Sequence, residues 1–125
     1  MAPDRRLAAP SRATAGAQAE ALAAEFLAAR GVTIVARNFR TRLGEIDLIG
    51  HDGATLIFVE VRLRRRDDYG GAGGSVTRSK RERLKAAARG YLSRLGREPP
   101  CRFDALLLDT LDPARIEWVR DAFSE

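Results

Sequence analysis

The chain of 125 residues is poor in cysteine and histidine and has no long apolar run. It contains one cysteine, Cys101, and one histidine, His51. These counts exclude an intramolecular disulfide, a cysteine metal site, a catalytic histidine pair and a histidine-rich zinc site. No segment approaches the roughly 18 consecutive apolar residues of a membrane-spanning helix, and the basic N-terminus is followed by no apolar signal-peptide core. We therefore expect a cytoplasmic protein with no membrane partner.

Basic residues outnumber acidic ones. The chain has 22 Lys and Arg against 17 Asp and Glu, a formal net charge of +5, and most of the basic residues are arginine. This balance favours a polyanionic partner, of which nucleic acid is the most common. The length predicts one domain, which we assign to residues 15–125. Residues 1–14 lack periodicity and are predicted to form a disordered basic arm.

A hairpin is predicted between Gly44 and Leu63. Two apolar runs, 45–49 and 56–63, flank Asp52-Gly53, a dipeptide typical of tight hairpin turns. With these two residues in the loop, Asp47 would lie opposite Phe58, and Glu60 opposite Glu45. Alternation of side chains would give one wholly apolar face, made of Ile46, Leu48, Ile57, Val59, Val61 and Leu63. The opposite face would bring Asp47 and Glu60 together as diagonal neighbours.

Helical periodicity marks two other segments. Residues 15–30 carry one apolar stripe with Glu20 at its border, and Gly31 follows as a stop. A second helix is predicted to begin at a capping box on Ser79, with Thr77 as the alternative cap. Its apolar face comprises Leu84, Ala87, Ala88, Tyr91, Leu92 and Leu95, and its other face is basic.

Three further strands complete the expected order α-β-β-β-α-β-β. We predict a strand over 32–41, a buried strand over 103–108 and an edge strand over 115–119. A charged and then glycine-rich loop joins the hairpin to the second helix, and it suits either a segment that grips substrate or a solvated loop with no such role.

The acids of the hairpin suit a hard cation. Asp47 and Glu60 offer oxygen ligands with no histidine or cysteine nearby, a set that favours Mg²⁺ or Mn²⁺ over zinc. Such an ion would bind a scissile phosphate and lower the pKa of an attacking water. The alternative is a partly exposed ion cluster in which the acids pair with Arg62, or with Arg40 and Arg42.

Several motifs together resemble the YraN family of small bacterial proteins. They are Gly16-x-x-Ala19-Glu20, Arg37-Asn38, GEIDLI at 44–49, FVEVR at 58–62, Lys80, Arg102-Phe103-Asp104 and Ala122-Phe123. The resemblance implies an α/β fold of the restriction-endonuclease-like type, with an αβββαβ core whose mixed central sheet is flanked by helices. It also implies similarity to Holliday-junction resolvases and a PD-(D/E)XK signature.

The same resemblance implies roles for individual residues. Asp47 and Glu60 would be the two signature acids, Glu20 the accessory helix acid, and Arg62 would stand in the place of the lysine. Arginine keeps its charge and cannot act as a base, so this departure favours phosphate binding over rapid cleavage. Asp104 is a weaker candidate, which we interpret as a capping or pairing residue.

Three functions remain open at this point. The first is a Mg²⁺-dependent endonuclease acting on structured or branched DNA, with catalytic residues Asp47, Glu60, Arg62 and Glu20. The second is a non-catalytic module that binds nucleic acid, and the third is a protein-interaction domain. The expected nucleic-acid contacts are Arg64, Arg65, Arg66, Arg78, Lys80, Arg81 and Lys85. Whether the chain forms a homodimer is left open.

Overall fold

The computed structural model describes residues 12–63, 77–109 and 115–122. Within them the order is α1 (Arg12–Ala29), β1 (Thr33–Thr41), β2 (Gly44–Asp52), β3 (Thr55–Leu63), α2 (Arg78–Leu95), β4 (Cys101–Leu108) and β5 (Ile116–Val119). This order is the one that the sequence predicts. Helix α1 begins inside the segment predicted to be a disordered arm, and residues 1–11 of that segment lie outside the described residues.

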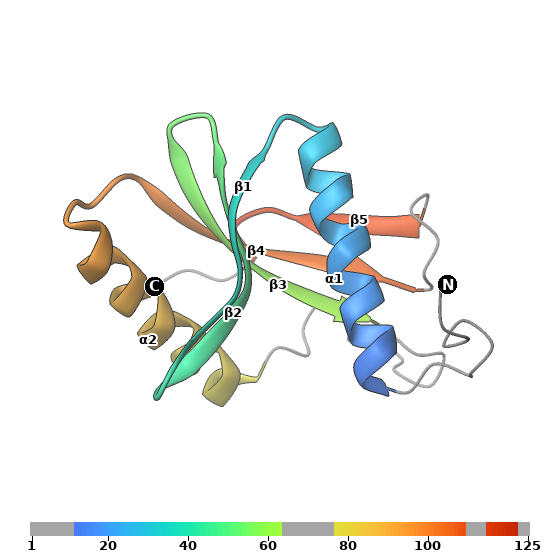
Figure 1. Cartoon of the computed structure of the whole chain (residues 1–125), viewed down its shortest axis with the longest axis horizontal. Helices are drawn as coiled ribbons and strands as arrows, with labels where there is room; N and C mark the ends of the chain where they lie inside the picture. The colour runs from blue at the N-terminus through green and yellow to red at the C-terminus, as the bar shows by residue number, and fades with distance from the viewer. Residues whose placement is uncertain (1–11, 64–76, 110–114, 123–125) are drawn as a thin grey trace, which may run out of the picture.

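The strands form one mixed sheet in the order β1-β2-β3-β4-β5 (Figure 1). Neighbouring strands are antiparallel except β3 and β4, which are parallel. Parallel neighbours need a long crossover connection, and α2 lies within the one that joins β3 to β4. The predicted mixed α/β fold with a central sheet flanked by helices is therefore confirmed.

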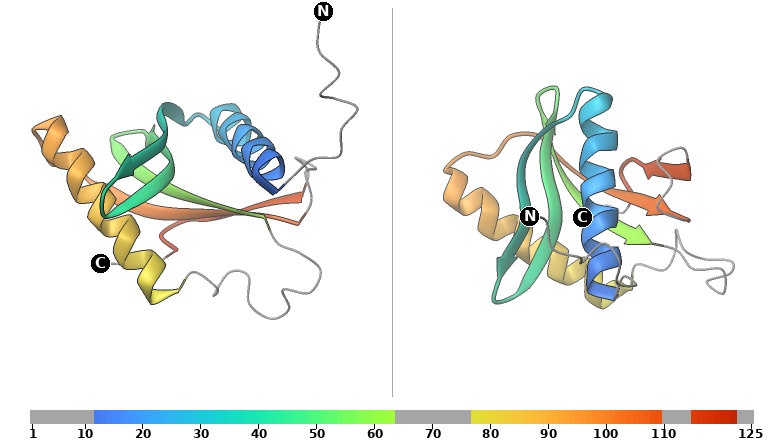
Figure 2. Two further views of the ribbon diagram at one scale, coloured as in Figure 1. Left: turned by 60° about the horizontal axis from the view of Figure 1, so that its bottom comes forward. Right: turned by 45° about the vertical axis from the view of Figure 1, so that its right-hand side comes forward.

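The two helices cover opposite faces of the sheet (Figure 2). On one face, Ala23 and Leu27 of α1 pack with Val59 and Leu106. On the other face, Leu84 of α2 packs with a cluster that includes Phe58, Phe103 and Ile49. Both faces of the central strands are thus apolar core, which fits the near-continuous hydrophobic sequence of β3 and β4. Neither helix in the described part of the chain is long and apolar enough to cross a membrane.

The hairpin of β2 and β3 differs in register from the prediction. Asp52 pairs with Thr55, so the loop is Gly53-Ala54 and not Asp52-Gly53. Gly53 has a φ of 63° and occupies the first loop position, where a type II′ turn takes glycine. The sequence is compatible with either turn, and the one that forms shifts every cross-strand pair by two residues. Leu48 therefore lies opposite Val59.

Beyond Leu48, strand β2 leaves β3. The cross-strand pairs of these two strands end at Leu48 and Val59, whereas β2 stays paired with β1 as far as Gly44. The prediction that Ile46 shares a face with Leu48 is wrong for this reason, because Ile46 packs in the cluster under α2 and Leu48 in the cluster under α1. The separation of the strands opens the sheet at Asp47.

Helix α2 begins where the alternative prediction placed it. Thr77 is the N-cap, and its hydroxyl accepts a hydrogen bond from the backbone N–H of Lys80 at 3.1 Å. The capping box predicted on Ser79 does not form, since Ser79 is already within the helix. The predicted apolar face of this helix is confirmed, with Leu84, Ala87 and Ala88 buried. The earlier start places Lys80 in the first turn.

Candidate active site

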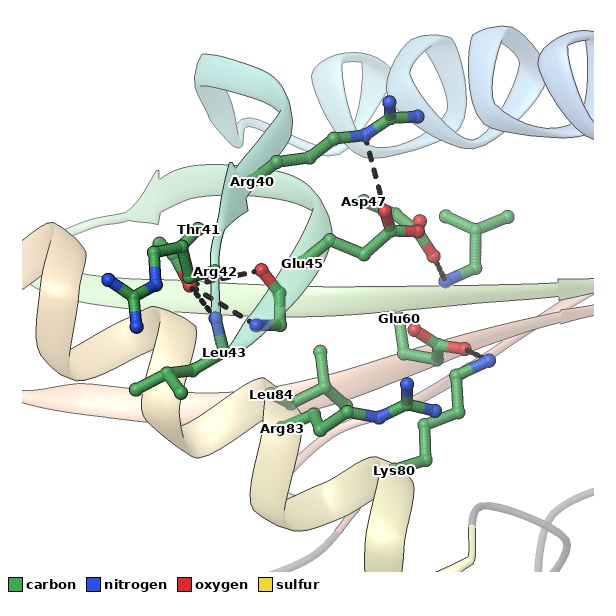
Figure 3. A pocket seen from close by; sticks show the side chains of 12 residues that line it. Arg40, Thr41, Arg42, Leu43, Glu45, Asp47, Glu60, Lys80, Arg83 and Leu84 are labelled. Atoms are coloured by element: carbon green, nitrogen blue, oxygen red, sulfur yellow. Dashed lines mark hydrogen bonds and ion pairs between the residues drawn. The ribbon is translucent and has the colours of Figure 1, made fainter.

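A cavity of about 460 Å³ lies where β2 separates from β3. One wall is the turn between β1 and β2, the other is the first half of α2, and the acids of the hairpin lie between them (Figure 3). Its lining consists of Arg40, Thr41, Arg42, Leu43, Gly44, Glu45, Asp47, Glu60, Val61, Lys80, Arg83 and Leu84.

Asp47 lies just beyond the last residue pair between β2 and β3. Its Oδ2 accepts a hydrogen bond from the backbone N–H of Val61 at 2.8 Å. A buried N–H without a partner is costly, so the carboxylate replaces the carbonyl that β2 no longer offers. This bond fixes the Asp47 side chain against β3, one residue along from Glu60.

Asp47 and Glu60 interact directly, as the hairpin pattern predicts. Glu60 is 3% exposed. Burial, together with repulsion from Glu60, raises the pKa of Asp47 from 3.8 to about 8. A side-chain hydrogen bond with Glu60 and the charge of Glu20 act in the same direction, while the Val61 N–H opposes them. Two carboxylates that share one buried position resist simultaneous ionisation, so the pair needs a nearby positive charge.

Lys80 supplies one such charge. Its Nζ lies 2.5 Å from Oε2 of Glu60. The sequence predicts Lys80 only as a contact to nucleic acid, but the structure brings it onto the second acid of the site. It is one of two lysines in the chain, the other being Lys85. The first turn of α2 thus places an ammonium group beside Glu60, and Thr77 anchors that turn.

Of the other predicted site residues, one lies near the two acids and the rest do not line the cavity. Glu20 is half-buried on α1 and close enough for its charge to affect Asp47. Arg62, predicted to take the place of the signature lysine, follows Glu60 on β3 but does not line the cavity. Arg78 and Arg81 lie on α2 outside the cavity lining. Nζ of Lys85 lies 3.8 Å from Oε2 of Glu82 on the same helix.

The predicted contacts Arg64, Arg65 and Arg66 lie outside the described residues, as does the rest of the loop predicted to grip substrate. Three arginines that the prediction did not assign to nucleic acid line the cavity instead. Arg40 comes from the end of β1, Arg42 from the β1–β2 turn and Arg83 from α2. The sequence could have indicated Arg40 and Arg42 by their position, because both come shortly before β2, the strand that carries Asp47.

Gly44 brings the two walls together. A Cβ at this position would overlap the backbone carbonyl of Arg83 on α2. Glycine therefore permits the β1–β2 turn to press against the helix, and any other residue would push the two walls apart. The Gly44 of the GEIDLI motif thus has a packing role in forming the cavity.

Asp104 is a structural residue, in agreement with its interpretation as a pairing residue. It is fully buried. Its carboxylate accepts hydrogen bonds from Arg102 Nε at 2.9 Å, Arg102 Nη2 at 3.0 Å, Trp118 Nε1 at 2.9 Å and the Asp121 backbone N–H at 2.9 Å. Arg102 also bonds Asp52 at 2.9 Å. This network joins the β2–β3 turn to β4 and β5.

The donors of the cavity fit a hard cation held by few protein ligands. Among the described residues, no three His, Cys, Asp or Glu side chains come together as a metal cluster. Asp47 and Glu60 would therefore be the two protein ligands, with water or phosphate oxygens completing the shell. Mg²⁺ is typically held in this way, and a bound cation would relieve the repulsion that raises the pKa of Asp47.

The fold and the cavity define a mixed-sheet α/β domain with a buried acid, a half-buried acid and a lysine where the sheet opens. The family described as "Uncharacterised protein family UPF0102" matches residues 19–108. A UPF0102 protein of Nitrosospira multiformis is 53% identical over 86% of this chain and 91% of its own length. A UPF0102 protein of Methylobacillus flagellatus is 50% identical over 87% of this chain and 96% of its own. The chain belongs to the UPF0102 family, the YraN family that its motifs resemble.

Proposed function

We propose that the protein is a divalent-metal-dependent endonuclease that hydrolyses phosphodiester bonds of DNA, most readily where the DNA is branched or otherwise structured. The observation that carries this proposal is the grouping of Asp47, Glu60 and Lys80 in a cavity lined by arginines. Glu60 is buried and Asp47 half-buried beside it, and perturbed pKa values such as that of Asp47 cluster at functional sites.

Each group has a role in this proposal. Asp47 and Glu60 would hold Mg²⁺ or Mn²⁺, which when bound polarises a phosphate and lowers the pKa of water. Lys80 would leave Glu60 for the substrate, where its ammonium stabilises the charge that develops on the phosphate. Arg40, Arg42 and Arg83 would bind flanking phosphates with their guanidinium groups. Access to DNA would place the protein in the cytoplasm.

Lys80 offers an ammonium group that Arg62, in the position of the signature lysine, does not. The sequence places an arginine where the resemblance implies lysine, which weakens the case for catalysis. A lysine that reaches Glu60 from α2 would supply the missing ammonium from another element of the fold. The proposal therefore assigns to Lys80 the role that the signature gives to its lysine, and to Arg62 no contact with the reacting phosphate.

The test is a scission assay on a four-way junction and on linear duplex with Mg²⁺ or Mn²⁺. We expect Asp47→Asn and Glu60→Gln each to abolish scission, and Lys80→Ala to slow it about 100-fold or more, as for loss of one charge-stabilising group. Arg62→Ala is the matched control, because it removes a cation two residues from Glu60 and should change the rate less than about threefold, being outside the set that stabilises the transition state.

Two results would overturn the proposal. The first is scission that survives Asp47→Asn. The second is an absence of scission together with salt-sensitive DNA binding that is unchanged in all four variants, which would leave the alternative of a non-catalytic nucleic-acid-binding module.

A further inference from the structure

Leu43 is the most exposed large apolar residue in the described part of the chain. Its exposed fraction is 65%, and the only other exposed large apolar residue there is Val35, at 44%. Single apolar residues on a surface need no explanation by themselves. Leu43 differs because it lines the rim of the candidate active site and lies between arginines (Figure 3).

The turn that carries Leu43 is held firmly. The hydroxyl of Thr41 accepts hydrogen bonds from the backbone N–H groups of Leu43 at 3.1 Å and Gly44 at 3.2 Å. The same hydroxyl lies 3.2 Å from the carbonyl of Gly44, to which it donates. Gly44 in turn packs on the backbone of α2 at Arg83. The turn therefore holds Leu43 in a fixed position, where most of its side chain is left exposed by the described residues.

The surroundings of Leu43 identify the class of ligand. Arg40 Nε lies 3.2 Å from Oε1 of Glu45, whereas no carboxylate of the described residues pairs with Arg42 or Arg83. A ligand that contacts this rim must therefore offer anionic groups to the arginines and an apolar surface to the leucine. Nucleic acid has both, because its phosphates are charged and the faces of its bases are apolar.

We propose that Leu43 inserts against an unstacked base of the bound DNA and so gives the protein its preference for branched over continuous duplex. Apolar wedges of this kind enter base steps that are already weakly stacked, because unstacking is least costly there. The ends of helical arms at a junction provide such steps, and a continuous duplex does not. This inference rests on the proposed function, since it names the DNA structure that the same site would select.

The test measures binding without cleavage, in EDTA. A four-way junction and a continuous duplex of equal length each carry 2-aminopurine, whose fluorescence rises when it is unstacked. We expect wild-type protein to bind the junction more tightly and to raise its fluorescence. Leu43→Ser should reduce the preference for the junction about tenfold, as expected for the loss of one base contact, and should abolish the fluorescence rise.

Two control variants distinguish insertion of Leu43 from a general change in DNA binding. Val35→Ser removes the other exposed large apolar residue, which lies at the irregular pairing of β1 with β2 between Ile34 and Ala36, and should leave the preference unchanged. Leu43→Met retains an apolar side chain and should keep most of it. Affinity for the continuous duplex, and its salt dependence, should be the same in all three variants.

An unchanged junction preference in Leu43→Ser would overturn the inference, as would an equal loss of affinity for both DNAs or an absence of DNA binding. A partner protein that contacts Leu43 would produce the first of these results. The outcomes are separable from those of the scission assay. Scission without an effect of Leu43 would contradict only the proposed insertion of Leu43. A Leu43-dependent preference without scission would contradict only the proposed catalytic step.

Discussion

The sheet contains two acidic regions that differ in how completely the carboxylates are paired. At Asp104, four hydrogen-bond donors surround a fully buried carboxylate, and two of them come from one guanidinium. At Asp47 and Glu60, two carboxylates share one backbone N–H and one ammonium, and the pKa of Asp47 is raised. A buried charge that is fully paired is a structural element, whereas two adjacent carboxylates with a single ammonium between them have too little positive charge and could accept a cation.

The largest effect is expected from the removal of Asp104. We expect Asp104→Ala to lower the free energy of unfolding by about 3–5 kcal/mol, as for one partner of a buried ion pair. Arg102, whose pKa is held above its usual range by Asp104 and Asp52, would lose its main partner. Urea unfolding measures the loss, and the single tryptophan, Trp118, reports on the network because its Nε1 bonds Asp104.

The contradictory outcome for Asp104→Ala is a loss below about 1 kcal/mol, the value typical of an ordinary hydrogen bond. Glu82→Ala is a control on the exposed side of α2, where Oε2 of Glu82 lies 3.8 Å from Nζ of Lys85. Exposed pairs of this kind contribute little, so this substitution should leave unfolding nearly unchanged.

The second prediction concerns pH and the other acidic region. The folded protein binds the Asp47 proton more tightly than the unfolded chain does, because its pKa is raised from 3.8 to about 8. Between these values the unfolded state is ionised and the folded state keeps the proton, so the free energy of unfolding falls as pH rises from about 4 to 8. Asp47→Asn should remove most of this loss, because asparagine carries no proton to release.

The measurement is urea unfolding in EDTA at several pH values across this window. Glu45→Gln serves as the control, since Glu45 is an exposed acid of the same strand that pairs with Arg40, and it should keep the wild-type slope. An Asp47→Asn protein with the same slope as wild type would show that Asp47 is ionised throughout the range.

A smaller effect is expected at the contact that shapes the cavity. Gly44→Ala would force the β1–β2 turn away from α2, because a Cβ overlaps the Arg83 carbonyl. We expect a loss of about 1–2 kcal/mol, typical of overpacking, with unchanged fluorescence from the distant Trp118. Gly16→Ala is the control, since its Cβ meets no atom within 4 Å, and it should stabilise helix α1 slightly. Equal effects of the two substitutions would contradict the role of Gly44.

The sequence predicts the elements well because each has a local signal. The apolar stripe of α2 is a periodic pattern. The two apolar runs that flank Asp52-Gly53 predict the hairpin, and the hairpin is sufficient to place Asp47 near Glu60. The hairpin register could not be predicted, because Asp52-Gly53-Ala54 permits two turns that differ by two residues in pairing. The separation of β2 from β3 at Asp47 is a long-range effect that no local pattern encodes.

The site was predicted in part for the same reason. Its acids lie on a hairpin, so their proximity follows from local geometry. Lys80 and Arg83 reach the cavity from α2, and their position depends on how the helix packs across the sheet. Only the tertiary structure relates Lys80 to Glu60, which are 20 positions apart and separated by residues outside the described ranges.

The most direct test of the central claim is calorimetric titration of the protein with Mn²⁺, without DNA. The account predicts saturable binding of one ion, which Asp47→Asn and Glu60→Gln both abolish and Asp104→Asn leaves intact once its fold has been verified by Trp118 fluorescence. Lys80→Ala should retain binding or strengthen it, because the ammonium competes with the ion for Glu60. Binding that survives Asp47→Asn, or no binding to wild-type protein, would contradict the claim that the paired acids form a cation site.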